Sequence, residues 1–237
     1  MDEELAQPRL AVPCPAVPRP AVPRPAVPAG VIAVVRAPTA GRARTIVRGL
    51  VLAAVPAVEL TMTVPGAVRI IAEFAASALS GGTVLGAGTV LDPEACSACA
   101  EAGAAFIVSP VTDPAVLARA HDRGVPYVGG ALTPTEVLAS MRAGSDAVKL
   151  FPVGSVGGAG YLRALREPLP GLRAVVSGGI AAAEVAGYLA AGAHAVCLGG
   201  ALIDRAAARR GDADAVAVHA RRVLDEITEA DGHADDH

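Results

Sequence analysis

Two residues of this chain could carry out covalent chemistry together, because each places a reactive side chain inside a short apolar run. Lys149 is the only lysine among the 20 Lys and Arg residues, and it lies in the run AVKLFP. Glu59 interrupts a second run, AVELTM. A desolvated lysine can lose its proton and attack a carbonyl carbon, which an arginine cannot do. A buried carboxylate is costly unless it has a partner or a raised pKa, and a general acid or base has both properties.

This pair would support imine chemistry. The free amine of Lys149 attacks a ketone, the carbinolamine loses water, and the protonated imine withdraws electrons from the adjacent carbon. Glu59 would move protons for the dehydration and for the alcohol whose deprotonation breaks a carbon–carbon bond. We expect burial to lower the pKa of Lys149 from about 10.4 to roughly 7–8, which would supply free amine near neutral pH. The reaction needs no metal and no cofactor. The alternatives are a surface lysine in a chain that avoids lysine and a glutamate exposed at a strand edge.

The elements that must position these side chains follow from an alternation of short apolar runs with helical stretches of about 10–15 residues. Asp92-Pro93 and Asp113-Pro114 mark two helix starts, and further helices are expected over 135–144 and 212–230. Eight such repeats over residues 31–230 predict a (β/α)8 TIM barrel, an α/β fold, as one domain. The expected strands are 31–35, 57–62, 83–86, 105–109, 126–128, 147–151, 174–177 and 195–199.

The active site of such a barrel is assembled at the C-terminal ends of its strands. Besides Lys149 and Glu59, the polar residues at these ends are Arg36, Thr63, Thr89, Ser109 and Ser177. Glycine-rich turns follow the last two strands, at Gly178-Gly179 and Gly199-Gly200. Glycines let the backbone approach an anion closely, and backbone N–H groups attract it without a basic side chain. Two such turns on adjacent strands predict a phosphate site, although each alone could be a tight turn.

The remaining composition limits the partners. A net charge of −3 and 3% aromatic residues argue against nucleic-acid binding, and no apolar run is long enough to span a membrane. We expect a soluble, cytoplasmic protein without metal, since the Cys96-x-x-Cys99 pair has no second ligand pair. Residues 1–30 carry AVPRP-type repeats and are expected to form a disordered tail, as are residues 231–237.

Several motifs together resemble the 2-keto-3-deoxy-6-phosphogluconate (KDPG) and 4-hydroxy-2-oxoglutarate (KHG) aldolase family. They recur in family order over about 170 residues and read VVRA, ELTMTVP, GAGTV, FIVSP, LTPTE, KLFP and SGGI. The resemblance implies a class I aldolase that forms a Schiff base at Lys149, uses Glu59 as acid and base, and releases pyruvate. It also implies a homotrimer of barrels.

Carried over residue by residue, the resemblance implies that Thr89 and Ser177 hold the pyruvyl carboxylate, while Pro110 and Phe151 line the site. Many members have an arginine at Thr63, so Arg36 is the expected counter-charge here. Gly200 stands where the family commonly has serine, which removes one phosphate hydrogen bond. A phosphorylated 2-keto acid is therefore the favoured small-molecule substrate. The competing functions are a phosphosugar isomerase or epimerase on a similar barrel and a non-catalytic phosphate-binding barrel.

Overall fold

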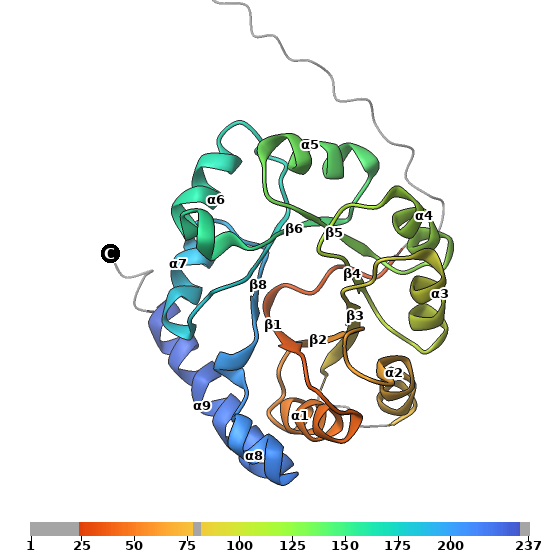
Figure 1. Ribbon diagram of the computed structural model, residues 1–237. Coiled ribbons are helices and arrows are strands. Elements are labelled where there is room, and N and C mark those ends of the chain that lie inside the picture. The colour runs from red at the N-terminus through yellow and green to blue at the C-terminus, as the bar shows by residue number, and fades with distance from the viewer. Residues whose placement is uncertain (1–23, 78–81, 233–237) are drawn as a thin grey trace, which may run out of the picture.

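The computed structural model describes residues 24–77 and 82–232, which form a closed barrel of parallel strands (Figure 1). Each strand pairs with the next one along the chain, and the last pairs with the first. The predicted (β/α)8 barrel is thus confirmed. Its strands are β1 (Gly30–Val35), β2 (Ala57–Thr61), β3 (Val84–Gly88), β4 (Ile107–Val108), β5 (Tyr127–Ala131), β6 (Ala147–Leu150), β7 (Ala174–Ser177) and β8 (Ala195–Leu198).

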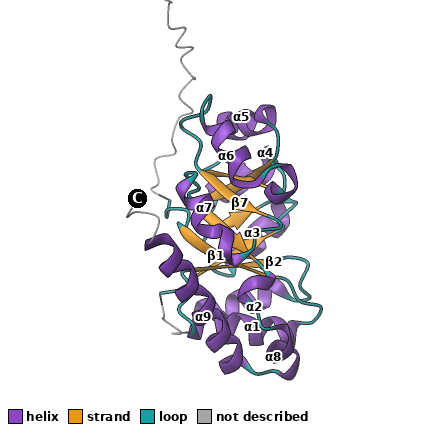
Figure 2. Ribbon diagram, turned by 90° about the vertical axis from the view of Figure 1, so that its left-hand side faces the viewer, coloured by secondary structure: helices purple, strands orange, loops and turns teal. Residues whose placement is uncertain are grey.

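Helices surround the strands on the outside of the barrel (Figures 1 and 2). The helix starts expected at Asp92 and Asp113 are present. The Asp92 side chain accepts a hydrogen bond from one backbone N–H group of the first turn, and the Asp113 side chain accepts from two. The α-helices are α1 (Ala40–Leu52), α2 (Ala67–Ala76), α3 (Pro93–Glu101), α4 (Pro114–Asp122), α5 (Pro134–Ala143), α6 (Gly158–Arg166), α7 (Val185–Ala190), α8 (Arg205–Arg210) and α9 (Ala213–Gly232). Short 3₁₀ turns occur at Val153–Val156, Ala182–Glu184 and Gly200–Leu202.

The strand boundaries differ most from expectation around β4 and β5. Strand β4 is shorter than the predicted 105–109, whereas β5 continues through Gly129 and Gly130 beyond the predicted end at residue 128. A Cβ on Gly130 would lie 2.0 Å from the carbonyl carbon of Pro110. The two backbones therefore approach so closely that only glycine fits, and the glycines extend this strand.

The alternation of side chains along the strands separates two apolar layers. Outward-facing residues such as Val35 and Leu60 pack beneath the helices in the larger core. Inward-facing residues, including Ile32, Phe106 and Val175, fill the barrel interior as a second cluster. The interior is therefore a packed core, and the two polar residues of interest replace apolar side chains within it.

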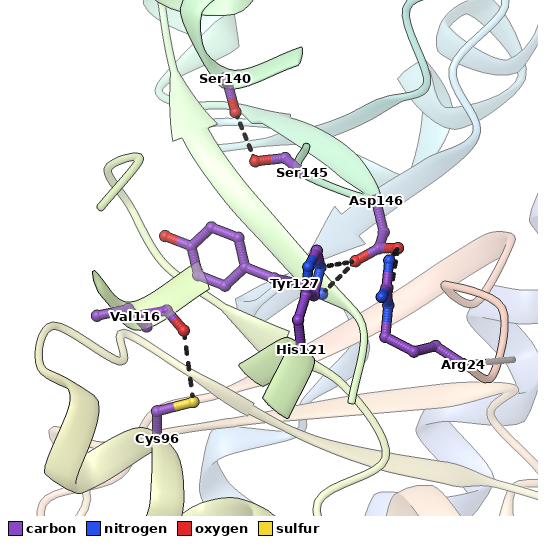
Figure 3. A network of polar contacts seen from close by, with 8 residues as sticks. All are labelled: Arg24, Cys96, Val116, His121, Tyr127, Ser140, Ser145 and Asp146. Atoms are coloured by element: carbon purple, nitrogen blue, oxygen red, sulfur yellow. Dashed lines mark hydrogen bonds and ion pairs between the residues drawn. The ribbon is translucent and has the colours of Figure 1, made fainter. Parts of the chain in front are cut away.

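The N-terminal end of the barrel is closed by chain that the sequence assigned to the disordered tail. Val27 is buried with the interior cluster, and its carbonyl oxygen lies 3.0 Å from Nε2 of His194. Arg24 pairs with Asp146, whose carboxylate also bonds His121 (Figure 3). The predicted tail boundary at residue 30 is therefore wrong for residues 24–29, which pack against the barrel. Residues 1–23 lie outside the described chain.

The C-terminal helix extends further than the sequence predicted. Helix α9 ends at Gly232, so the predicted C-terminal tail starting at residue 231 overlaps the end of this helix.

Cys96 and Cys99 are buried on α3. The Cys96 sulfur approaches the carbonyl oxygen of Val116, and the Cys99 sulfur approaches the sulfur of Met62. No helix among the described residues is long and apolar enough to cross a membrane.

Candidate active site

Lys149 and Glu59 meet inside the barrel. Lys149 is on β6 and Glu59 on β2, and Figure 1 shows these strands on opposite sides of the barrel. The Nζ atom lies 3.3 Å from Oε1 and 3.4 Å from Oε2 of the carboxylate. Glu59 is 1% exposed and Lys149 is 6% exposed. The two residues singled out from the sequence thus form a buried ion pair in an otherwise apolar interior.

Neighbouring glycines make room for the pair. A Cβ on Gly88 would lie 2.1 Å from Oε1 of Glu59, and one on Gly86 would lie 2.5 Å from the ring of Phe106. Both glycines are on β3, next to the strand that carries Glu59. The bare backbone of β3 therefore leaves space for the Glu59 carboxylate at Gly88 and for the Phe106 ring at Gly86.

The protonation of Lys149 differs from the sequence-based expectation. Burial disfavours the ammonium and is the largest single influence, but the attraction and hydrogen bond of Glu59, together with Cys197, outweigh it and raise the pKa of Lys149 above its ordinary value. The expected lowering to about neutral pH is therefore wrong for the substrate-free protein, because the prediction weighed burial without the paired carboxylate.

Cys197 is an interior residue whose position the sequence did not reveal. It is on β8 with the interior cluster and lies near both members of the ion pair, while its thiol interacts with the hydroxyl of Ser177. Burial raises the pKa of Cys197 to about 12, so the thiol is neutral. Its place at the site follows from the pairing of β8 with β1, which closes the barrel.

A cavity of about 670 Å³ opens at the C-terminal ends of β1, β7 and β8. Ser177 and Cys197 connect it to the interior, and the Nζ atom of Lys149 lies 5.7 Å from the centre of the Phe151 ring in its wall. The structure brings most of the predicted binding residues together here. Those that line the cavity are Arg36, Phe151, Ser177, Gly178, Gly179, Gly199 and Gly200.

Three arginines that sequence reasoning missed line the same cavity. Arg42 comes from α1, and Arg205 and Arg209 come from α8. With Arg36 they make four guanidinium groups, and none of the carboxylates in the described chain forms a salt bridge with any of the four. The i, i+4 spacing of Arg205 and Arg209 directly after the Gly199-Gly200 turn was the available signal. The predicted phosphate site thus has basic side chains as well as glycine turns.

The other three predicted residues do not line this cavity. Thr63 is exposed, and its hydroxyl is 2.8 Å from that of Thr61. Thr89 directly follows Gly88 and has a φ of 59°, in the left-handed region that a β-branched residue rarely adopts. Pro110 lines a separate cavity that also reaches Phe151. These three residues therefore follow the C-terminal ends of β2, β3 and β4.

The fold and this site define a barrel enzyme with a buried amine–carboxylate pair close to a cavity that four arginines line. Comparison with known proteins gives the family. The chain belongs to the KDPG and KHG aldolase family, whose model matches residues 26–219. The predicted family and the lyase class are confirmed.

Individual relatives agree with this assignment. The chain is 35% identical over 150 residues to a 2-dehydro-3-deoxy-phosphogluconate aldolase of Pseudomonas aeruginosa, covering 63% of this chain and 68% of that protein. It is 34% identical over 170 residues to a 2-dehydro-3-deoxy-6-phosphogalactonate aldolase of Escherichia coli K12, covering 71% and 82%. A solved structure described as native KDPGal is 28% identical with a TM-score of 0.73, covering 87% of this chain and 99% of the other.

Proposed function

We propose that this protein is a class I aldolase that cleaves 2-dehydro-3-deoxy-6-phosphogluconate or a related 4-hydroxy-2-keto acid. The products are pyruvate and an aldehyde, either glyceraldehyde 3-phosphate or glyoxylate. The observation that carries the proposal is the buried Lys149–Glu59 pair, with 3.3 Å between Nζ and Oε1. The names of the two relatives differ in the configuration of the sugar acid, so both epimers belong in the assay.

In the proposed reaction, Glu59 first takes a proton from the Lys149 ammonium, and the free amine attacks the C2 carbonyl of the substrate. Glu59 returns the proton to the carbinolamine hydroxyl, which leaves as water and gives the protonated imine. The Glu59 carboxylate then removes the proton of the C4 hydroxyl. The C3–C4 bond breaks, its electrons pass to the imine as an enamine, and the aldehyde departs. Protonation of C3 and addition of water release pyruvate and restore the amine.

Substrate binding follows from the positions of the remaining residues. We assign the pyruvyl carboxylate to Arg36, Thr89 and Ser177, and the walls to Thr63, Pro110 and Phe151. The phosphate is assigned to the backbone at Gly178, Gly179, Gly199 and Gly200, where N–H groups can approach an anion closely. Seven of these residues line one cavity, which supports a single extended substrate that reaches from Lys149 to β8.

We further propose that the protein acts in the cytoplasm as a homotrimer. Exposed apolar side chains on the active-site face support an assembly, since Leu91 is 54% exposed and Val111 is 51% exposed. They follow β3 and β4. Sedimentation equilibrium is expected to give three chains per particle, and Val111→Asp is expected to lower that number. A monomer at all concentrations would contradict the trimer.

Trapping with borohydride tests the Schiff base. Incubation with pyruvate and sodium borohydride is expected to attach a reduced pyruvyl group to the peptide that contains Lys149. The chain has no other side-chain amine, so digestion and mass spectrometry can assign the adduct without ambiguity. Absence of an adduct on Lys149 would overturn the proposed mechanism.

Lys149→Arg separates the aldolase from the two competing functions. An isomerase or epimerase would use Lys149 only as a positive charge, so it would keep part of its activity with arginine. An imine-forming enzyme is expected to lose nearly all pyruvate release. A non-catalytic barrel would be stabilised by inorganic phosphate without turnover of any 2-keto-3-deoxy acid.

A further inference from the structure

We propose that Arg205 binds the terminal phosphate of the substrate directly and occupies the place that a side chain at position 200 would take. This inference rests on the proposed aldolase function and names the residue that selects for a phosphorylated substrate. A Cβ built on Gly200 would lie 2.9 Å from Nη2 of Arg205. The guanidinium therefore lies directly over the glycine turn, in the wall of the cavity.

Arg205 is available to an anion. Its guanidinium makes no salt bridge with a carboxylate of the described chain, although Asp204 is its neighbour in sequence. The Oδ1 atom of Asp204 instead accepts hydrogen bonds from the backbone N–H groups of Ala206 and Ala207. The Asp204 carboxylate thus caps α8 and does not pair with Arg205, which lines the cavity.

The balance of charge favours a phosphorylated substrate. Four arginines line the cavity: Arg36, Arg42, Arg205 and Arg209. A 2-keto acid carries one negative charge on its carboxylate, and a phosphate adds about 1.5 to 2 more at neutral pH. An unphosphorylated acid would leave most of this positive charge unneutralised. Arginine also offers a planar pair of donors that matches two phosphate oxygens.

The first experiment compares Arg205→Ala with Arg210→Ala, a matched change on the same helix whose side chain does not line the cavity. The kcat/KM is measured for 2-keto-3-deoxy-6-phosphogluconate and for the same acid without phosphate, and for their C4 epimers. In Arg205→Ala the ratio of phosphorylated to unphosphorylated kcat/KM is expected to fall about 10- to 100-fold, because a charge-assisted hydrogen bond is lost. Arg210→Ala is expected to keep the wild-type ratio. An unchanged ratio in Arg205→Ala would overturn the proposal.

The second experiment tests the shared position. In wild type, Gly200→Ser must displace the guanidinium, so it is expected to give no gain with the phosphorylated substrate. In the Arg205→Ala background the new hydroxyl can reach the vacated place, and a gain in kcat/KM of about 3- to 10-fold is expected from one restored hydrogen bond. An equal effect of Gly200→Ser in both backgrounds would show that the two side chains do not share one place and would overturn the proposal.

Trapping with pyruvate distinguishes failure of this inference from failure of the aldolase. Pyruvate has no phosphate, so borohydride is expected to attach it to Lys149 in Arg205→Ala as well as in the wild type. Loss of trapping in the wild type would contradict the aldolase itself. Trapping in both proteins together with an unchanged substrate ratio would contradict only the role of Arg205.

Discussion

The Oε1 atom of Glu59 lies 2.1 Å from the point at which a Cβ on Gly88 would stand. The observed position of the proposed acid and base therefore requires that residue 88 on the adjacent strand carry no side chain. The carboxylate has little room to move elsewhere, since Glu59 is buried and Lys149 is its ion-pair partner. A single methyl group added to β3 would thus displace the Glu59 carboxylate although neither reactive residue is replaced.

We predict that Gly88→Ala lowers kcat by at least about 100-fold, because a displacement of the order of 1 Å is enough for such a loss. The measurement is steady-state pyruvate release, with urea unfolding to establish that the variant is folded. Gly187→Ala is the matched control, since a Cβ there meets nothing within 4 Å and the residue lies in α7. It is expected to keep full activity and to gain about 0.5–1 kcal/mol of stability. Full activity in Gly88→Ala would contradict the prediction.

Glu59→Gln is expected to lower the pKa of Lys149 and the activity together. Removing the carboxylate leaves burial as the main influence, so the pKa falls from its raised value. The kcat is expected to drop about 10²- to 10⁴-fold, because the proton carrier is lost. The single lysine allows a direct measurement, since labelling with ¹⁵N-lysine gives one Nζ resonance to follow with pH.

Glu226→Gln serves as the control for this titration, as Glu226 is exposed on α9 and pairs with Arg222. It should leave the Lys149 titration unchanged.

In the wild type, the raised pKa of Lys149 means that the pair stabilises the fold at neutral pH. This contribution is lost only in the alkaline range, as pH rises through that pKa. An identical Lys149 pKa in wild type and Glu59→Gln would contradict the assigned cause.

At the opposite end of the barrel, the stability provided by Asp146 is expected to depend on acid pH. Burial alone would raise its pKa, but bonds from His121, the Tyr127 N–H group and Arg24 lower it from 3.8 to about 2. The folded carboxyl thus titrates below the unfolded one, so the stabilisation is present above about pH 4 and is lost as pH falls toward 2. Its size at pH 7 is roughly 2 kcal/mol.

Urea unfolding of Asp146→Asn from pH 7 to pH 2 measures this contribution. The difference in unfolding free energy from wild type is expected to shrink steadily below pH 4. Asp225→Asn, an exposed change on α9, is expected to show a small difference at every pH. A constant difference between Asp146→Asn and wild type over this range would show that the carboxylate charge is not responsible.

Replacing Thr89 by glycine is expected to preserve or raise stability and to lower activity. Its left-handed backbone, with φ of 59°, costs a β-branched residue roughly 1–3 kcal/mol, whereas glycine adopts it freely. Glycine also costs about 0.4–1 kcal/mol through the unfolded chain, so Thr89→Gly is expected to be as stable as wild type or more stable. Its kcat/KM should fall about 10-fold with the loss of the hydroxyl, and Thr89→Ser should keep most of it. Full activity in Thr89→Gly would remove Thr89 from the site.

The sequence predicted the barrel because eight short apolar runs alternate with stretches of helical period, and it predicted Lys149 and Glu59 because charged residues stand out in apolar strands. It could not predict which helices lean over the cavity, so Arg42, Arg205 and Arg209 were missed. Their roles depend on the packing of α1 and α8 at the barrel rim, which no local pattern encodes. The shift of the Lys149 pKa was predicted in the wrong direction for a related reason. Whether this pKa rises or falls depends on how close Glu59 lies to Lys149 across the barrel.

Closure of the barrel by residues 24–29 also has a practical consequence. Val27 and Arg24 are held at the N-terminal ends of the strands, while the cavity opens at their C-terminal ends. Anything joined to the chain ahead of Arg24 therefore starts from the end of the barrel opposite the cavity. An immobilisation tag or a fused enzyme should be attached there, provided that the junction leaves Arg24 and Val27 intact. A cut at residue 30 would instead uncover the floor of the barrel.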